Sequence, residues 1–255
     1  MIPKIIHYCW FSGDKKPALI RKCIRSWKKH LPDYEIRCWD GNSFDFDSLD
    51  FTREAMSVKQ YAAAADYVRL YALYNHGGIY LDTDVEVYKS LDPFLGDVFF
   101  SGIDRNRCGT EYKDFIEAGI MGSEKGLPYL RECMEYYETN HFIREDATYN
   151  RDLMAPEVYA RQAYKYGFMS EDKEQLLSNG IHIYPRNVFA NGNYIYDHQD
   201  IDYKPLTALH HNFSAWGVDR LNRGKVWMFC YKHNLLKAYR KSETIIVKLF
   251  KPFKK

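Results

Sequence analysis

The hydrophobic pattern at the start of the chain alternates between short apolar runs and one amphipathic segment. Residues 5–10 are largely apolar, as in a buried parallel strand, and residues 17–30 carry apolar side chains on one helical face. Residues 34–39 form a second strand-like run that ends in a turn sequence, Asp-Gly-Asn. This order predicts a β-α-β unit, and it therefore favours a parallel sheet that is covered by helices. We expect His7, inside the first run, to be a core histidine rather than a ligand.

The strongest helical pattern, residues 57–76, leads through two glycines straight into a strand-like stretch. In that stretch, GGIYLDTDVEV at residues 77–87, apolar positions alternate with polar ones that include Asp82 and Asp84. Side chains at i and i+2 of a strand point the same way. The pattern therefore predicts one strand with two adjacent carboxylates near its carboxyl end, which is where ligands bind in open α/β sheets.

Two carboxylates held this close repel each other unless a cation lies between them. Hard oxygen ligands without a thiolate suit Mg²⁺ or Mn²⁺, ions that commonly bridge to phosphate oxygens. Asp66 and Arg69 lie three residues apart on the preceding helix, so they share one of its faces. Because that helix runs directly into the aspartates, we expect both residues near the same pocket. The plainer alternatives are a solvated strand face and a surface ion pair.

Later segments give weaker patterns. They predict strands at residues 98–101, 181–184 and 207–213 and a helix at residues 127–140, whereas residues 141–160 show no clear pattern.

Charge is unevenly distributed along the chain. The net charge of the 255 residues is +2, which gives no argument for a nucleic-acid partner. Residues 223–255, however, hold ten basic residues against one acidic residue, a charge of +9, and this leaves −7 for the remainder. The segment also has the pattern of a basic amphipathic helix. It therefore predicts peripheral contact with an anionic membrane, with a solvated helix packed on the domain as the alternative.

The six cysteines include no C-x-x-C pair, which argues against a thiolate zinc site and is typical of reduced cytosolic thiols. The first residues lack a secretory signal, and no run of about 18 apolar residues occurs. We therefore expect a cytoplasmic protein, placed at the inner face of the membrane if the basic segment docks there.

Three sequence blocks resemble one enzyme family. The run AAAADYVRLYALYNHGGIYLDTDVEV resembles the A-x-x-x-D-x-x-R…GG-x-Y-x-D-x-D block of glycosyltransferases with the DXD sugar-binding region. That family includes the yeast initiating α-1,6-mannosyltransferase and bacterial capsule enzymes, and the glucosylating clostridial toxins are more remote relatives. IPKIIHYCWFSG and ALHHNFSAWG resemble the first strand and the C-terminal block of the family. The three blocks occur in the family's order between residues 2 and 217.

The resemblance implies an α/β fold of the GT-A type, with a mainly parallel mixed sheet flanked by helices. Residues 1–222 would be the catalytic domain and residues 223–255 a helical extension of it. The implied reaction is retaining, metal-dependent transfer of a hexose from a nucleotide-sugar, with a UDP-sugar favoured over GDP-mannose. The implied acceptor is a saccharide or a lipid-linked precursor of bacterial capsule, lipopolysaccharide or glycolipid.

The resemblance also implies a metal shell for Mn²⁺ or Mg²⁺. Asp84 would bind the ion directly, and Asp82 would touch it through water or the donor's ribose and sugar. His211 and Ser214 would complete the shell, with His210 as a competitor one position away. The toxins carry a carboxylate where His211 stands.

Donor-binding roles follow in the same way. Asp66 and Arg69 would bind the hydroxyls of the donor sugar, Trp10 would stack on the base, and Trp216 would contact the diphosphate. Tyr80 lies on the predicted strand face of the aspartates and would border the donor, with cross-strand packing as the alternative. The implied catalytic set is Asp66, Arg69, Asp82 and Asp84. Four acidic residues are expected on the acceptor side: Glu111, Asp114, Glu117 and Asp152.

Two other function classes compete with this interpretation. Residues 82–85 also fit the D-x-D-x-[TV] motif of haloacid-dehalogenase-type phosphotransferases. That motif usually follows the first strand of its domain, whereas here a β-α-β unit and a long helix precede it. The later acidic motif of that class also fails, because Ser101 stands at its second aspartate. A non-catalytic sugar- or metal-binding module is the other alternative, and it would lack nucleotide-dependent stabilisation.

Overall fold

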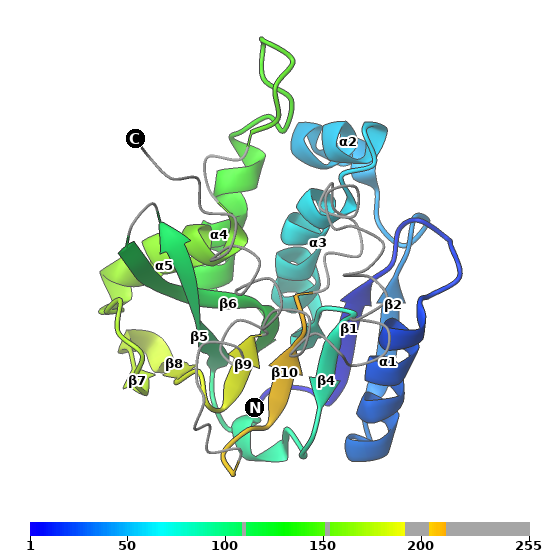
Figure 1. Ribbon diagram of the computed structural model, residues 1–255. Helices are drawn as coiled ribbons and strands as arrows, with labels where there is room; N and C mark the ends of the chain where they lie inside the picture. The colour runs from blue at the N-terminus through cyan, green and yellow to red at the C-terminus, as the bar shows by residue number, and fades with distance from the viewer. Residues whose placement is uncertain (109–110, 151–153, 192–203, 213–255) are drawn as a thin grey trace, which may run out of the picture. The chain divides into compact units, whose positions relative to one another are not determined.

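A seven-stranded mixed sheet forms the centre of the computed structural model, and a three-stranded sheet lies beside it (Figure 1). The structure describes residues 1–108, 111–150, 154–191 and 204–212. The order of the large sheet is β2-β1-β3-β6-β5-β8-β7, and that of the small sheet is β4-β10-β9.

The strands of the large sheet are β1 (Ile5–Cys9), β2 (Glu35–Trp39), β3 (Gly78–Leu81), β5 (Phe99–Cys108), β6 (Glu111–Ser123), β7 (Gln175–Leu176) and β8 (Ile181–Tyr184). The small sheet contains β4 (Val85–Val87), β9 (Phe189–Asn191) and β10 (Ala208–His210). The α-helices are α1 (Ala18–His30), α2 (Asp50–Ser57), α3 (Tyr61–His76), α4 (Pro128–Glu138) and α5 (Ala155–Ala163).

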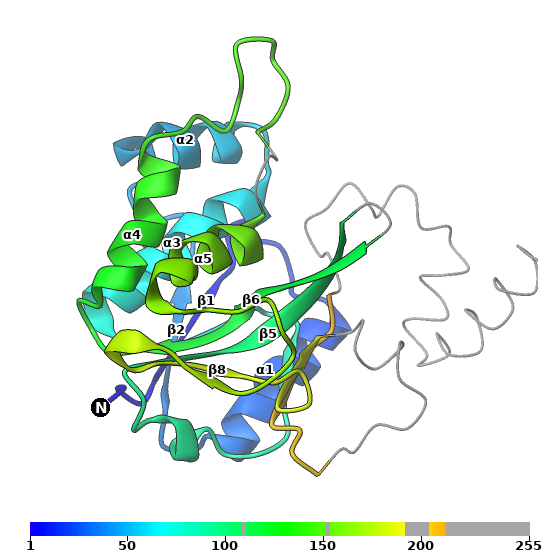
Figure 2. The same ribbon diagram turned by 90° about the vertical axis from the view of Figure 1, so that its left-hand side faces the viewer.

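Strand directions confirm the predicted α/β fold class. β1 pairs in parallel with β2 and with β3, and β5 pairs in parallel with β8. β6 runs antiparallel between β3 and β5, and β7 is an antiparallel edge strand. Most strands therefore point the same way in a mixed sheet. Figure 2 shows α3, α4 and α5 on one face of this sheet and α1 on the other.

The first β-α-β unit is confirmed, and so is the core role of His7. β1, α1 and β2 occupy the predicted segments almost residue for residue. The ring of His7 is fully buried, with Nε2 2.9 Å from the carbonyl oxygen of Gly77. The indole of Trp39 donates to Nδ1 of the same ring over 3.1 Å.

The long helix predicted at residues 57–76 is α3, which begins later than predicted, and a separate helix precedes it. Residues 50–57 form α2, which the pattern did not predict, and α3 begins only at Tyr61. Lys59 separates them because it adopts a left-handed φ of 58°, which a helix cannot contain. From Tyr61 to the glycines, α3 follows the prediction.

The prediction of one continuous strand over residues 77–87 is wrong. β3 ends at Leu81, a turn covers residues 82–84, and β4 then enters the small sheet, where it pairs antiparallel with β10. The N–H of Val85 donates to the carbonyl of Asp82 over 2.9 Å and closes the turn. The alternation of apolar and polar residues over residues 77–87 gave a wrong prediction because β3 and β4 are buried on both faces. Polar positions therefore do not mark a solvent face here.

β6 is a further element that the pattern missed, and a bulge interrupts it. Ser101 of β5 pairs with Met121 of β6, but Ile103 already pairs with Ile116, so residues 117–120 bulge out of the ladder. The buried hydroxyl of Ser101 lies 2.7 Å from the carbonyl oxygen of Glu117, which fixes the bulge. We call residues 117–120 the β6 bulge.

Other predicted elements differ mainly in length. β5 continues from the predicted residues 98–101 to Cys108, and the last predicted strand is confined to β10. α5 begins inside the stretch without a clear pattern and ends beyond it, at Ala163, and residues 223–255 lie outside the described residues. Among the described helices, none combines the length and the apolar character needed to cross a bilayer.

Candidate active site

Asp82 and Asp84 lie in the turn between β3 and β4, at the carboxyl end of β3. Here the chain leaves the large sheet for the small one. The backbone N–H of Asp82 makes the last bond to the large sheet, with the carbonyl of Gly119 at 2.8 Å. The two carboxylates therefore converge through a turn rather than through one strand face.

His210, at the end of β10, completes a group of three metal-ligand side chains. Its Nε2 lies 3.6 Å from Oδ2 of Asp82 and 3.4 Å from Oδ1 of Asp84. One ligand atom from each residue falls within 4.8 Å of the others. Pairing of β10 with β4 in the small sheet places the histidine there.

The electrostatics of this group fit a divalent cation. Burial alone would lower the pKa of His210, but the carboxylates of Asp84 and Glu117 outweigh it and hold that pKa well above its usual range. The site thus favours positive charge between its carboxylates. Two of the three donors are carboxylates, which suit Mg²⁺ or Mn²⁺, and the imidazole is a ligand for a transition metal.

His211 points to a different partner. Its Nε2 lies 3.1 Å from Oε2 of Glu86, which also accepts from the ammonium of Lys22 at 2.9 Å. Burial would raise the pKa of Glu86, but these two donors lower it to about 2. The backbone N–H of His211 donates to the carbonyl of Asp84 over 3.1 Å. The structure therefore brings His210, and not the ring of His211, to the aspartates.

Arg69 connects the helix α3 to the aspartates, as its spacing predicted. Only 4% of the residue is exposed. Its Nη2 lies 3.0 Å from Oδ1 of Asp66 and 3.4 Å from Oδ1 of Asp82. Burial raises the pKa of the Asp66 carboxyl to about 6, against the opposing effect of Arg69. The side chain of Asp66 is partly buried, whereas that of Arg69 is almost fully enclosed.

Tyr80 and Trp10 both lie at this edge, in different surroundings. Tyr80 is buried, and its hydroxyl donates to Oδ1 of Asp82 over 2.9 Å while its ring lies 4.8 Å from the guanidinium carbon of Arg69. Trp10 follows β1, with its indole donating to the carbonyl of Asp14 at 2.8 Å. The buried hydroxyl of Tyr80 thus orients the carboxylate of Asp82. Ser214 and Trp216 lie outside the described residues.

The β6 bulge supplies two site residues that the hydrophobic pattern did not rank. Oε1 of Glu117 lies 2.9 Å from Nδ1 of His210 and accepts the N–H of Gly119 at 2.7 Å. A Cβ atom on Gly119 would lie 2.7 Å from Nδ1 of His210 and 2.9 Å from Oδ2 of Asp82. The bulge is therefore the floor of the site. The only sequence signal for it was an acidic residue, Glu117, two positions before a glycine.

Of the other acidic residues expected on the acceptor side, the structure describes the side chain of Asp114 only. Asp114 forms a two-bond ion pair with Arg105, with both nitrogen–oxygen distances at 2.6 Å. Asp152 lies outside the described residues, as does the side chain of Glu111.

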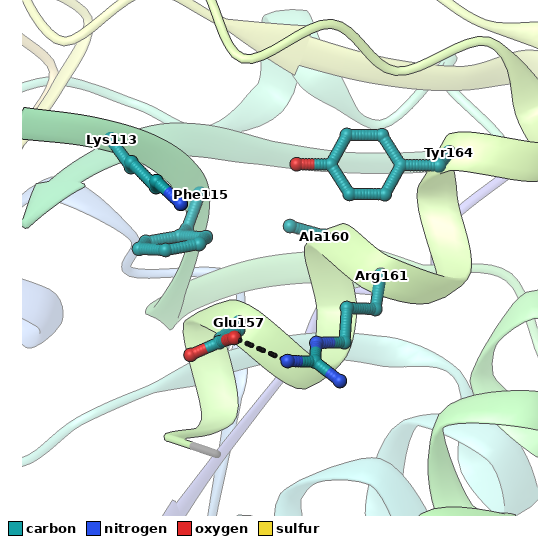
Figure 3. A pocket seen from close by; sticks show the side chains of 6 residues that line it. All are labelled: Lys113, Phe115, Glu157, Ala160, Arg161 and Tyr164. Carbon is teal, nitrogen blue, oxygen red and sulfur yellow. Dashed lines mark hydrogen bonds and ion pairs between the residues drawn. The ribbon is translucent and has the colours of Figure 1, made fainter. Parts of the chain in front are cut away.

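A separate cavity of about 230 Å³ lies between β6 and α5 (Figure 3). It is lined by Lys113, Phe115, Glu157, Ala160, Arg161 and Tyr164. No residue of the Asp82, Asp84 and His210 group contributes to its walls.

Comparison with known proteins identifies the kind of enzyme that the chain resembles. Residues 17–100, which include α3 and the turn with both aspartates, match the family model described as "Glycosyltransferase sugar-binding region containing DXD motif". The chain is a glycosyltransferase, and its residues 17–100 resemble this DXD-containing family. The predictions of a resemblance to this family, of a glycosyltransferase and of a nucleotide-sugar donor are thereby confirmed.

Relatives of the glycosyltransferase occur in a virus and in yeast. It is 28% identical over 224 residues to an uncharacterized glycosyltransferase of Acanthamoeba polyphaga mimivirus, with 85% of this chain and 84% of that protein covered. It is 34% identical over 140 residues to inositol phosphoceramide mannosyltransferase 3 of Schizosaccharomyces pombe, with 52% of this chain but only 36% of the yeast protein covered. Among solved structures, the glycosyltransferase GlyE of Streptococcus pneumoniae TIGR4 matches at a TM-score of 0.49 and 11% identity, over 95% of this chain and 64% of that one.

Proposed function

We propose that this glycosyltransferase is metal-dependent and retains the anomeric configuration as it moves a sugar from a nucleoside-diphosphate donor to a saccharide or lipid-linked acceptor. The proposal favours a UDP-sugar over GDP-mannose. It places the reaction in the synthesis of bacterial surface polysaccharide or glycolipid, in the cytoplasm. The observation that carries the metal-dependent donor chemistry is the convergence of Asp82, Asp84 and His210 within 4.8 Å.

In this proposal, Asp84 and His210 hold Mn²⁺ or Mg²⁺, and Asp82 contacts the ion indirectly. A bound divalent ion supplies Lewis-acid stabilisation of the negative charge that grows on the diphosphate leaving group. The chain's own contribution is to keep the ligands in place. Tyr80 and Arg69 both contact Oδ1 of Asp82, which leaves its Oδ2 directed at His210.

Donor recognition divides between a partly buried carboxylate and a fully enclosed cation. Asp66 is about a quarter exposed at its side chain, so its oxygens can accept hydrogen bonds from sugar hydroxyls. Arg69 is enclosed and already bonded, so we assign it to holding Asp66 and Asp82 rather than to touching the sugar. Trp10 as the base-stacking residue and Trp216 as the diphosphate contact remain part of the proposal.

Two observations support a lipid-linked acceptor. The Schizosaccharomyces pombe relative is named as an inositol phosphoceramide mannosyltransferase, so a related chain is named for an acceptor anchored in a membrane. Residues 223–255 carry the basic charge that would hold the enzyme at an anionic membrane face. If the full chain binds phosphatidylserine vesicles no better than neutral vesicles at low salt, the membrane part of the proposal is wrong.

Donor hydrolysis tests the function without knowledge of the acceptor. UDP- and GDP-sugars, GDP-mannose included, are incubated with the full chain and Mn²⁺ or EDTA. We compare the wild type with Asp84→Asn and with Asp33→Asn, an exposed aspartate before β2 at the opposite edge of the sheet. One donor should be hydrolysed, with turnover that requires Mn²⁺ and Asp84 but not Asp33.

The product anomer, read by NMR with a sugar or alcohol acceptor added, tests retention separately. No turnover of any donor, together with no thermal stabilisation by UDP or GDP with Mn²⁺, would overturn the proposed reaction.

A further inference from the structure

We propose that Glu117 is a positioning residue for the metal site. Its carboxylate fixes the ring of His210 so that Nε2 faces Asp82 and Asp84 and remains available to a divalent ion. This inference rests on the proposed metal-dependent function.

The two ring nitrogens of His210 face different groups. Nδ1 lies 2.9 Å from Oε1 of Glu117, whereas Nε2 faces the aspartate oxygens at 3.4 and 3.6 Å. A carboxylate accepts hydrogen bonds, so Nδ1 carries the hydrogen in this contact. When the imidazole is neutral, its lone pair is therefore on Nε2. Metal-binding histidines commonly donate their second nitrogen to a carboxylate, which sets the tautomer and raises the basicity of the ligand.

Glu117 cannot turn away from this contact without breaking the floor of the site. Only 2% of the residue is exposed. The same oxygen that faces His210 accepts the N–H of Gly119 at 2.7 Å. The backbone carbonyl of Glu117 lies 2.7 Å from the hydroxyl of Ser101. One carboxylate oxygen thus joins the β6 bulge to the histidine.

The chain contains a matched pair for comparison. Glu86 is also buried and also faces a histidine, with 3.1 Å between Oε2 and Nε2 of His211. The ring of His211, however, is not directed at the aspartates. If Glu117 acts on the metal through its histidine, the equivalent change at Glu86 should leave metal affinity unchanged.

The test measures binding of Mn²⁺ alone to the full chain, from the EPR signal of free Mn²⁺. The variants are Glu117→Gln, His210→Ala, their double variant and Glu86→Gln. A glutamine at position 117 keeps an oxygen that accepts the N–H of Gly119, so the bulge is retained while the negative charge is lost. We expect Glu117→Gln to weaken Mn²⁺ binding about tenfold. The double variant should bind no more weakly than His210→Ala, because Glu117 acts through that ring.

Each other outcome has a definite meaning. Wild-type affinity in Glu117→Gln, or additive losses in the double variant, would overturn the positioning role while leaving the metal-dependent function intact. A loss in Glu86→Gln but not in Glu117→Gln would transfer the role to the His211 pair. A wild type that neither binds Mn²⁺ nor hydrolyses a donor would overturn the proposed function and this inference together.

A measurement on the wild type does not depend on folding of the variants. In ¹⁵N NMR with Mg²⁺ bound, His210 should show a protonated Nδ1 and an unprotonated Nε2. The opposite tautomer would overturn the inference.

Discussion

The guanidinium of Arg69 donates from Nη1 to the backbone carbonyl of Ala118 over 2.8 Å. Ala118 lies in the β6 bulge, where the pairing of β6 with β5 is interrupted. The other terminal nitrogen of the same guanidinium reaches Asp66 and Asp82. One buried side chain therefore holds the helix, the bulge and the aspartate turn in a fixed relation.

Replacement of Arg69 should cost both stability and activity. Arg69→Met leaves the carboxylates of Asp66 and Asp82 without their cation and should lower the free energy of unfolding by about 3 kcal/mol. Arg69→Lys keeps the charge but not the planar fork, so it should lose less stability while donor hydrolysis still falls. Urea denaturation and donor hydrolysis measure the two effects.

The matched control is Arg53→Met, which breaks an exposed pair with Asp50 on α2. It should change the free energy of unfolding by less than about 0.5 kcal/mol. Equal stability losses at positions 53 and 69 would show that the buried network has no special energetic role.

The sequence predicted the parts of the site that depend on local periodicity. Asp66 and Arg69 were placed near the aspartates because helical spacing sets their common face, and α3 does run into β3. The β-α-β unit was predicted for the same reason, since each of its elements has one unambiguous pattern.

The parts that the sequence did not predict depend on contacts between distant segments. His210 and His211 are adjacent in the chain, and only the pairing of β10 with β4 decides which ring meets the aspartates. Glu117 is 93 residues from His210, and a bulge has no period by which it can be recognised. Resemblance to a family supplied a ligand set but could not settle a difference of one residue.

Separate replacement of the two histidines should give different defects. His210→Ala should raise the Mn²⁺ concentration for half-maximal donor hydrolysis by about tenfold or more, because loss of a ligand should cost at least as much as loss of an outer partner. His211→Ala should leave that concentration unchanged. It should instead lower stability by about 1 kcal/mol, since the buried Glu86 loses a hydrogen-bond donor.

Hydrolysis rates over a series of Mn²⁺ concentrations and urea denaturation distinguish the two variants. The reverse result, with the metal defect in His211→Ala, would show that the ring of His211 turns to the ion when donor binds.

Gly119→Ala should inactivate the enzyme without unfolding it. The added methyl group would lie 2.7 Å from Nδ1 of His210 and 2.9 Å from Oδ2 of Asp82, distances that force both side chains to move. Displacement of the side chains of His210 and Asp82 by the methyl group should lower the rate of donor hydrolysis about 100-fold. Gly96→Ala is the control, because its added methyl group would meet no atom within 4 Å. Equal activities of the two variants would show that the β6 bulge can shift to accommodate the methyl group without disturbing the site.

His7 should make the fold sensitive to acid. Burial lowers the pKa of His7 to about 4, whereas an exposed histidine titrates near 6.5. The folded state therefore binds this proton less readily than the unfolded state. The stability contribution is fully present above pH 6.5 and is lost as the pH falls towards 4, by about 3 kcal/mol in total. Urea denaturation at pH 7 and pH 4.5 should show a larger loss for the wild type than for His7→Gln.

His141 provides a control of opposite sign. Its ring is exposed, and the carboxylate of Glu54 raises its pKa, so its stabilising contribution is present at low pH and is lost as the pH rises through that raised pKa. Removal of this side chain in His141→Gln should therefore make the loss of stability between pH 7 and pH 4.5 greater than in the wild type. Removal of His7 should make that loss smaller. If both variants follow the wild-type pH profile, neither histidine governs the acid sensitivity of the fold, and protonation of carboxylates accounts for it instead.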